Sequence, residues 1–166
     1  MNPSTQPTPA KILIVDDEEI VLVALRDTLR QMGHPVVTAL TVAEGLDLLG
    51  RESFAIVFTD YQMPQLTGLE FLARVRELQP GASRILITAV LNLGTVINAI
   101  NRAEVLRFLV KPWRREDLEE TVTAAMQRHA GHALDARELQ AAREIIASQQ
   151  ERIDRLEAEN RRLKAR

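Results

Sequence analysis

The sequence predicts an α/β fold in which helices pack on both faces of a five-stranded, doubly wound parallel sheet. Short apolar runs rich in β-branched residues alternate five times with segments of helical periodicity. Such an alternation is typical of parallel strands joined by right-handed crossovers. Most of the runs also end at a polar residue, and parallel sheets bind their ligands at the carboxyl ends of the strands.

The predicted strands are the apolar runs, bounded by charged, glycine or proline residues. They are expected at residues 11–15, 35–38, 54–60, 84–88 and 105–110. The predicted helices show apolar residues three or four positions apart. They are expected at residues 18–32, 41–50, 66–78 and 92–103 and from residue 116 onward.

Several helix ends carry their own signals. Gly33 and Pro80 are expected to end the first and third helices. Thr41 followed by Glu44 forms a predicted capping box at the start of the second helix. In the first helix the apolar residues Ile20, Val21, Leu25, Leu29 and Met32 recur at helical spacing, and in the third Leu69, Leu72, Val75 and Leu78 form one face.

Composition limits the classes of function. The chain of 166 residues is 46% hydrophobic and 27% charged, which suits one globular domain with an extension. A net charge of −2 provides no overall field for nucleic acid or an anionic membrane. The absence of cysteine excludes disulfides and thiolate sites. We expect a cytoplasmic protein with a disordered tail at residues 1–10, neither a signal peptide nor a membrane span.

Polar residues stand at the ends of four predicted strands. Asp16 and Asp17 follow the first, Asp60 ends the third, Thr88 ends the fourth and Lys111 follows the fifth. Taken singly, the aspartates are ordinary helix caps or turn formers. Because the carboxyl ends of parallel strands share one edge, their joint placement predicts a single site.

Three carboxylates at one edge raise one another's pKa unless a cation is bound. Mg²⁺ is the expected cation, since it prefers oxygen ligands and a few carboxylates. Asp17 and Asp60 are predicted as direct ligands, Asp16 as a ligand through water, and the backbone carbonyl of Gln62 as a further ligand.

The remaining polar residues suit a phosphoryl group. Lys111 supplies a compact cation and Thr88 a hydroxyl donor. A carboxylate can act as a nucleophile and form an acyl phosphate, and this role is predicted for Asp60.

These residues resemble a known family. Asp16-Asp17, Asp60 followed by Met63-Pro64 and Gly68, Thr88-Ala89, and Phe108 with Lys111-Pro112 together resemble the receiver domain of two-component response regulators. The resemblance covers about residues 10–130. It implies a flavodoxin-like fold with strand order 2-1-3-4-5, and phosphorylation of Asp60 by a sensor histidine kinase in the presence of Mg²⁺.

The resemblance also implies a switch. Thr88 and Phe108 would change position on phosphorylation and alter the face formed by the fourth helix, the fifth strand and the fifth helix. A cis peptide bond between Lys111 and Pro112 is implied as well. The protein would be a phosphoacceptor that dephosphorylates itself, and not an enzyme. Gln62 and Val90 would tune the lifetime of the phosphoryl group.

The segment Lys111-Pro112-Trp113 is similar to the corresponding segment of receivers that precede enhancer-binding ATPases and cyclic-dinucleotide enzymes. The alternative for Trp113 is simple packing at the base of the fifth helix.

Residues 131–166 predict a coiled coil that follows a receiver domain at residues 11–130. Its dimer seam, the a and d positions of the heptads, is expected to contain Leu139, Ile146, Ile153, Leu156, Asn160 and Leu163. Isoleucine at a, leucine at d and one asparagine at a favour a parallel homodimer. Glu138 would face Arg143, and Arg152 would face Glu157, across the dimer.

Two alternatives stay open for this segment. The same charges could form i,i+4 pairs along a single solvated helix. Gly131 could mark a break, so continuity of the fifth helix into the coiled coil is undecided.

Rival functions also stay open. A phosphatase of the haloacid dehalogenase type uses similar residues, but it needs an Asp-x-Asp pair at the end of the first strand. A dimeric scaffold that acts independently of phosphorylation is a third hypothesis, beside the signalling receiver and the phosphatase. No output domain follows the heptads, so the chain could be the N-terminal part of a larger regulator. The basic residues follow the heptads, so no direct binding of nucleic acid is expected.

Overall fold

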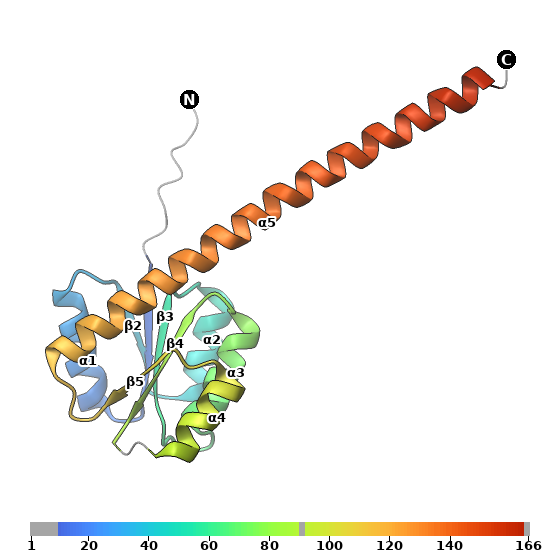
Figure 1. Cartoon of the computed structure of the whole chain (residues 1–166). Coiled ribbons are helices and arrows are strands. Elements are labelled where there is room, and N and C mark those ends of the chain that lie inside the picture. Colours follow the sequence, from blue (N-terminus) through green and yellow to red (C-terminus); the bar gives the residue numbers. More distant parts are fainter. Residues whose placement is uncertain (1–9, 90–91, 165–166) are drawn as a thin grey trace. The chain divides into compact units, whose positions relative to one another are not determined.

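A single parallel sheet forms the centre of the fold (Figure 1). The computed structural model describes residues 10–89 and 92–164. The strands are β1 (Ile12–Val15), β2 (Val36–Ala39), β3 (Ile56–Asp60), β4 (Ser83–Thr88) and β5 (Arg107–Val110). All pair in parallel in the order β2-β1-β3-β4-β5. The predicted fold class and strand order are confirmed.

Five helices alternate with these strands. They are α1 (Glu19–Gln31), α2 (Val42–Arg51), α3 (Gly68–Leu78), α4 (Leu93–Ala103) and α5 (Arg115–Lys164). The helical assignment of α5 continues through Gly131, so that residue does not break the helix. No helix in the described part of the chain is both long and apolar enough to cross a bilayer.

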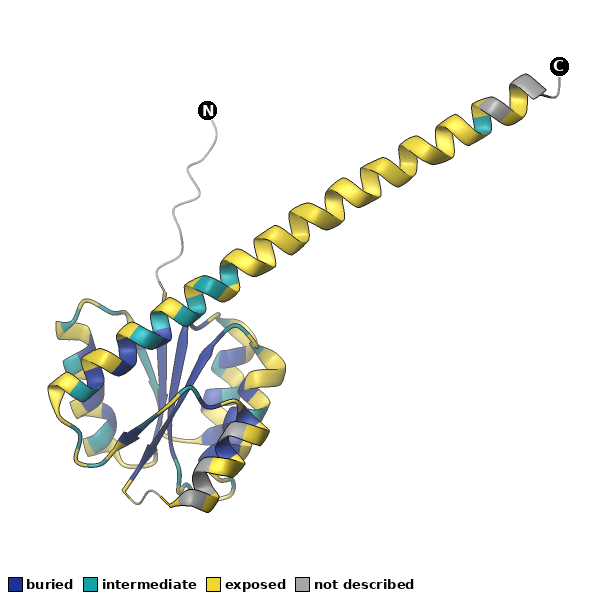
Figure 2. Ribbon diagram, viewed as in Figure 1, coloured by how far each residue is buried: buried dark blue, intermediate teal, exposed yellow. Residues whose placement is uncertain are grey.

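Two apolar layers cover the sheet because successive strand residues point to opposite faces. One layer contains Leu13, Val57 and Leu86 and is covered by buried residues of α2, α3 and α4. The other contains Ile14 and Phe58 and is covered by α1 and the first turns of α5. Figure 2 shows the three central strands β1, β3 and β4 as buried along their whole length. Burial on both faces explains why these strands are continuous apolar runs.

The helix starts follow capping chemistry. The Thr41 side chain accepts a hydrogen bond from the Glu44 backbone N–H at 3.2 Å, as the capping box predicts. The Glu44 side chain accepts from the Leu40 N–H at 2.9 Å instead of from Thr41, so only this half of the predicted box forms. Thr67 and Glu70 form a complete capping box, in which each side chain accepts from the other residue's backbone N–H. Helix α3 therefore begins at Gly68, and the predicted start at residue 66 was too early.

Two of the predicted apolar faces were partly wrong. Ile20 is 83% exposed, and α1 buries Leu22, Leu25 and Leu29 instead. Leu78 is 54% exposed at the end of α3. The sequence Ile20-Val-Leu-Val23 is apolar throughout, so periodicity alone does not choose the buried stripe.

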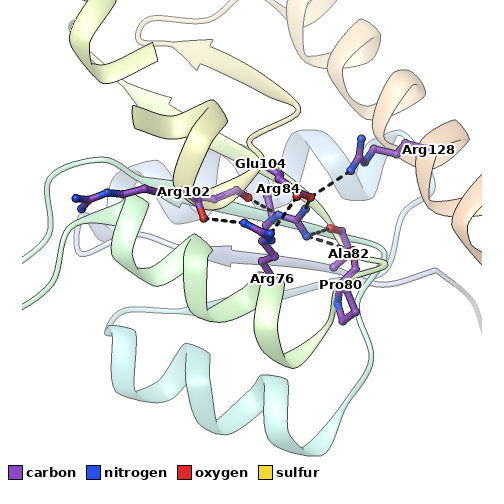
Figure 3. A network of polar contacts seen from close by, with 8 residues as sticks. Arg76, Pro80, Ala82, Arg84, Arg102, Glu104 and Arg128 are labelled. Carbon is purple, nitrogen blue, oxygen red and sulfur yellow. Dashed lines mark hydrogen bonds and ion pairs between the residues drawn. The ribbon is translucent and has the colours of Figure 1, made fainter. Parts of the chain in front are cut away.

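A buried arginine joins the ends of several elements away from the strand ends that carry Asp60 and Thr88 (Figure 3). The side chain of Arg84, near the start of β4, is 1% exposed. Its guanidinium donates to the backbone carbonyls of Ala103 at 2.6 Å, Ala82 at 2.8 Å and Pro80 at 3.3 Å. Because Ala103 is the last residue of α4, Arg84 satisfies a carbonyl that the helix itself leaves unpaired.

Glu104 completes this network from the surface. Its carboxylate lies 3.3 Å from Arg84, 3.3 Å from Arg76 and 3.9 Å from Arg128 (Figure 3). Burial lowers the pKa of the Arg84 guanidinium, and the charge of Glu104 opposes that effect. Glu104 therefore partly offsets the cost of burying this arginine.

The chain divides into two compact units between His129 and Ala130. The second unit is the remainder of α5, whose side chains are exposed almost throughout (Figure 2). Four of the predicted seam residues are exposed there: Leu139, Ile146, Ile153 and Leu156. The side chains of Asn160 and Leu163 lie outside the described residues, as do residues 1–9 of the predicted tail.

Candidate functional site

A polar cavity of about 550 Å³ lies at the carboxyl edge of the sheet. Five of the predicted site residues line it: Asp17, Asp60, Gln62, Thr88 and Lys111. Glu18, Tyr61, Ala89 and Asn92 also line it. The parallel strands thus bring together side chains that are up to 94 residues apart in sequence.

Asp60 occupies a defined position at the end of β3. Its side chain is 9% exposed, and its Oδ2 accepts a hydrogen bond from the Gln62 backbone N–H at 3.0 Å. The following loop is closed by the Gly68 N–H, which donates to the Tyr61 carbonyl at 2.8 Å. The Gln62 N–H thus fixes one oxygen of the carboxylate at the edge of the cavity, and the closed loop positions Gln62.

Lys111 is the cation of the site. Its Nζ lies 2.9 Å from Asp60 Oδ1, 3.3 Å from Glu18 Oε1 and 3.5 Å from Asp16 Oδ2. Burial lowers the pKa of Lys111, but the hydrogen bond to Asp60 and the charge of Asp16 outweigh it, so the pKa is raised overall. The ammonium therefore stays charged at neutral pH.

Asp16 is the most deeply buried carboxylate of the site, at 0% exposed. Its Oδ1 accepts from the Glu18 N–H at 2.8 Å, whereas its Oδ2 has no hydrogen-bond partner among the described residues. Burial raises the pKa of this carboxyl to about 6, against the opposing effects of the Glu18 N–H and Lys111.

These carboxylates fit a hard cation. Oxygens of Asp16, Asp17 and Asp60 lie within 4.8 Å of one another. Asp16 Oδ2 is buried without a hydrogen bond, and its ion pair with Lys111 is shared with Asp60, so a further positive charge bound there would lower the cost of burying these carboxylates. Oxygen-only donors at this spacing suit Mg²⁺ or Ca²⁺ better than a thiolate- or imidazole-binding metal.

Replacing Asp16 with asparagine should stabilise the protein when divalent cations are absent. The raised pKa means that native Asp16 binds a proton more tightly than unfolded Asp16, so its contribution to stability falls as pH rises from about 4 through about 6. Asparagine retains the oxygen that accepts from Glu18 and removes the charge. In EDTA at about pH 7.5, the variant should gain about 1–3 kcal/mol in the free energy of unfolding by urea.

The gain should shrink at about pH 4, where the wild-type carboxyl is protonated. A variant that is less stable than wild type at about pH 7.5 in EDTA would contradict this reading of Asp16.

The other predicted positions are partly described. Thr88 is buried at the end of β4, and Phe108 is half-buried against the layer under α2, α3 and α4. The Lys111–Pro112 peptide bond is cis, as the resemblance implied. Trp113 packs against the layer beneath α1 and α5, in line with simple packing. Val90 lies outside the described residues.

Sequence reasoning missed Glu18 as a site residue. It directly follows Asp16-Asp17 and stands at the N-cap position of α1, yet its side chain makes no capping hydrogen bond. The predicted helix at residues 18–32 included Glu18 as an ordinary first-turn residue, so the sequence held no signal for its place in the site.

Comparisons with known proteins identify the family of the chain. The family model for the response regulator receiver domain matches residues 12–123. The hydrogenase transcriptional regulatory protein HoxA of Cupriavidus necator is 36% identical over 118 residues, 71% of this chain and 24% of that protein. The transcriptional regulatory protein GlrR of Escherichia coli is 34% identical over 122 residues, 74% of this chain and 27% of that protein. The chain thus spans about a quarter of the length of these relatives.

Solved structures show the same fold. The signal receiver domain of an HD domain-containing protein from Pseudomonas fluorescens Pf-5 superposes with a TM-score of 0.71 at 29% identity, over 75% of this chain and 99% of that one. A CheY-like receiver domain protein from Methanospirillum hungatei JF-1 also gives a TM-score of 0.71, at 27% identity, with the same coverage of both chains. With the family model matching most of the chain, the protein belongs to the response regulator receiver domains.

Proposed function

We propose that Asp60 accepts a phosphoryl group from the phosphohistidine of a sensor histidine kinase. The observation that carries the proposal is the buried Asp60 carboxylate, 2.9 Å from the Lys111 ammonium in an open cavity at the sheet edge. An oxygen of Asp60 attacks phosphorus, the P–N bond to the histidine breaks as the P–O bond forms, and the imidazole leaves. Lys111 remains beside the oxygens that carry the charge.

Mg²⁺ is the proposed cofactor. Asp17 and Asp60 would bind it directly, Asp16 through water, and the backbone carbonyl of Gln62 would add a ligand. When bound, the ion neutralises the carboxylates and the negative charge of the phosphoryl group.

Thr88 and Phe108 are the proposed switch residues. Thr88 lines the same cavity as Asp60, so its hydroxyl can reach a phosphoryl group formed there. Phe108 lies on the neighbouring strand β5, whose residue Val110 pairs in register with Thr88. A shift of Thr88 toward phosphate would change packing at Phe108 and thereby the surface of α4, β5 and α5. Gln62, at the cavity wall, and Val90 are proposed to tune the phosphoryl lifetime.

Replacing Asp60 with asparagine should abolish phosphorylation. With acetyl phosphate and Mg²⁺ the wild-type chain should gain one phosphoryl group, seen by intact mass and mapped by peptide analysis to the segment that contains Asp60. Asparagine retains the shape but cannot form the acyl phosphate, so Asp60→Asn should show no label, and EDTA should suppress label in wild type.

Label that persists in Asp60→Asn would refute this assignment. Sustained turnover of a generic phosphomonoester by the wild type would instead favour the phosphatase alternative. An unlabelled wild type would favour a scaffold independent of phosphorylation.

The exposed part of α5 is proposed to form a parallel homodimer. Leu139, Ile146, Ile153 and Leu156 are 48–66% exposed although each is a large apolar residue at an a or d position. Glu138, Arg143, Arg152 and Glu157, which would pair between two copies, form no ion pair with another described residue. Glu138, Arg143 and Arg152 have no oppositely charged residue three or four positions away in the helix, so their charges are available for pairing between two copies.

Replacing Ile146 with aspartate should convert the dimer to a monomer. A charge at an a position faces the same charge in the second copy and removes a buried apolar contact. Light scattering should give twice the chain mass for wild type, with and without beryllofluoride and Mg²⁺, and about one chain mass for Ile146→Asp at the same concentration.

Leu134→Asp is the matched control, because Leu134 is 58% exposed but lies at a c position, outside the seam. It should remain dimeric. A monomeric wild type without beryllofluoride would show that dimerisation is not constitutive.

The chain covers only about a quarter of its relatives' length, which suggests a further role for the proposed helix pair. HoxA and GlrR are transcriptional regulatory proteins about four times as long as the matched segment. We propose that the coiled coil connects this receiver domain to an output partner or output segment.

A further inference from the structure

Glu18 is a surface glutamate whose side chain turns toward the site instead of capping its helix. It is the N-cap residue of α1, with extended backbone angles of φ −93° and ψ 106°, and it makes no side-chain capping bond. Its carboxylate accepts a hydrogen bond from Lys111 Nζ at 3.3 Å. Its own backbone N–H donates to Asp16 at 2.8 Å, so the residue has a fixed place at the cavity wall.

The three carboxylates on Lys111 differ sharply in exposure. The side chains of Asp16 and Asp60 are 0% and 9% exposed, whereas that of Glu18 is 63% exposed. Moving either aspartate away would disturb the strand ends. Glu18 can leave Lys111 for water at little cost, because an exposed ion pair stabilises by only a small amount.

We propose that Glu18 is a positioning residue that competes with the incoming phosphoryl group for Lys111. The inference rests on the proposed phosphorylation of Asp60. In the resting protein Glu18 accepts one hydrogen bond from the Lys111 ammonium and adds a negative charge at the cavity wall. When the phosphoryl group passes to Asp60, its oxygens take the place of Glu18 beside Lys111, and the Glu18 carboxylate returns to solvent. Glu18 thus slows phosphorylation by dianionic donors.

The test compares three variants of the full chain with wild type. Glu18→Gln removes the charge with little change in shape. Glu18→Asp keeps the charge but shortens the side chain, which weakens its contact with Lys111. Glu19→Gln is the matched control, because Glu19 is the adjacent exposed glutamate in the first turn of α1 and makes no contact with Lys111.

The first readout is the second-order rate constant for phosphorylation with acetyl phosphate and with phosphoramidate in Mg²⁺. Glu18→Gln should raise the acetyl phosphate rate about 2- to 5-fold, the range that an exposed ion pair supports. The gain should be smaller with phosphoramidate, which carries less negative charge, and smaller at high salt. Glu19→Gln should remain within about 1.5-fold of wild type on both donors, because its charge is screened by solvent.

The second readout needs no phosphorylation. The ¹⁵N-ammonium NMR signal of Lys111 should shift in Glu18→Gln and, to a smaller extent, in Glu18→Asp, and it should be unchanged in Glu19→Gln.

The outcomes distinguish the proposed phosphorylation of Asp60 from the proposed role of Glu18. If wild type is not phosphorylated, the proposed function fails. If wild type is phosphorylated but Glu18→Gln and Glu19→Gln behave alike on both donors, only the role of Glu18 is overturned. A slower Glu18→Gln would also overturn it, because Glu18 would then assist the reaction.

Discussion

Gly68→Ala is expected to destabilise the protein by about 3 kcal/mol and to slow phosphorylation of Asp60 about 100-fold. A Cβ built on Gly68 would overlap the backbone oxygen of Asp60 and would lie 2.9 Å from its carbonyl carbon and 3.1 Å from Leu86. The nearest atom is backbone, so no flexible side chain can move aside. Relief requires displacement of the loop that follows Asp60, and a displacement near 1 Å at a reacting group is enough for a rate loss of that order.

Urea unfolding followed by Trp113 fluorescence measures the first effect, and acetyl phosphate labelling measures the second. Gly50→Ala is the control, since nothing lies within 4 Å of a Cβ built on Gly50 in helix α2. That substitution should be neutral or stabilise by up to about 1 kcal/mol, because alanine is the better helix former. Equal unfolding free energies for Gly68→Ala and wild type would disprove the argument from close approach.

The sheet was predictable because its signal is local. Strands buried on both faces must be apolar throughout, so β1, β3 and β4 stand out from their surroundings. Placement of Asp60, Thr88 and Lys111 at one edge then follows from parallel pairing alone, without knowledge of any contact. That is why the sheet edge that carries the candidate site could be predicted from the sequence.

Contacts between side chains that are far apart in sequence could not be predicted. Glu18 and Lys111 are 93 residues apart, and either residue alone is an ordinary surface charge. The choice between Ile20 and Leu22 as the buried residue of α1 depends on the rotation of the helix against the sheet, which four consecutive apolar residues do not encode.

Arg84 was missed for a different reason. It is the first residue of the predicted fourth strand, and nothing in the sequence predicted its burial, since arginine is seldom fully buried without a partner. Its strongest partners are backbone carbonyls of Ala82 and Ala103, and a carbonyl has no signature in the sequence.

Arg84→Ala is therefore expected to destabilise the protein by about 3–5 kcal/mol. The substitution leaves a cavity in place of a side chain that is 1% exposed, and it leaves the carbonyls of Ala82 and Ala103 without their donor. Urea unfolding of the full chain measures the change. Arg74→Ala, at an exposed position of neighbouring helix α3, should change stability by less than about 0.5 kcal/mol.

Glu104→Gln separates the two halves of the network in Figure 3. The side chain of Glu104 is 47% exposed, so loss of its charge should lower the free energy of unfolding by urea by less than about 1 kcal/mol despite three arginine neighbours. A cost for Arg84→Ala as small as that for Glu104→Gln would show that the hydrogen bonds from Arg84 to the buried carbonyls contribute little to stability. If the carbonyls dominate, amide exchange in Arg84→Ala should rise first at the carboxyl end of α4, because Arg84 holds the Ala103 carbonyl there.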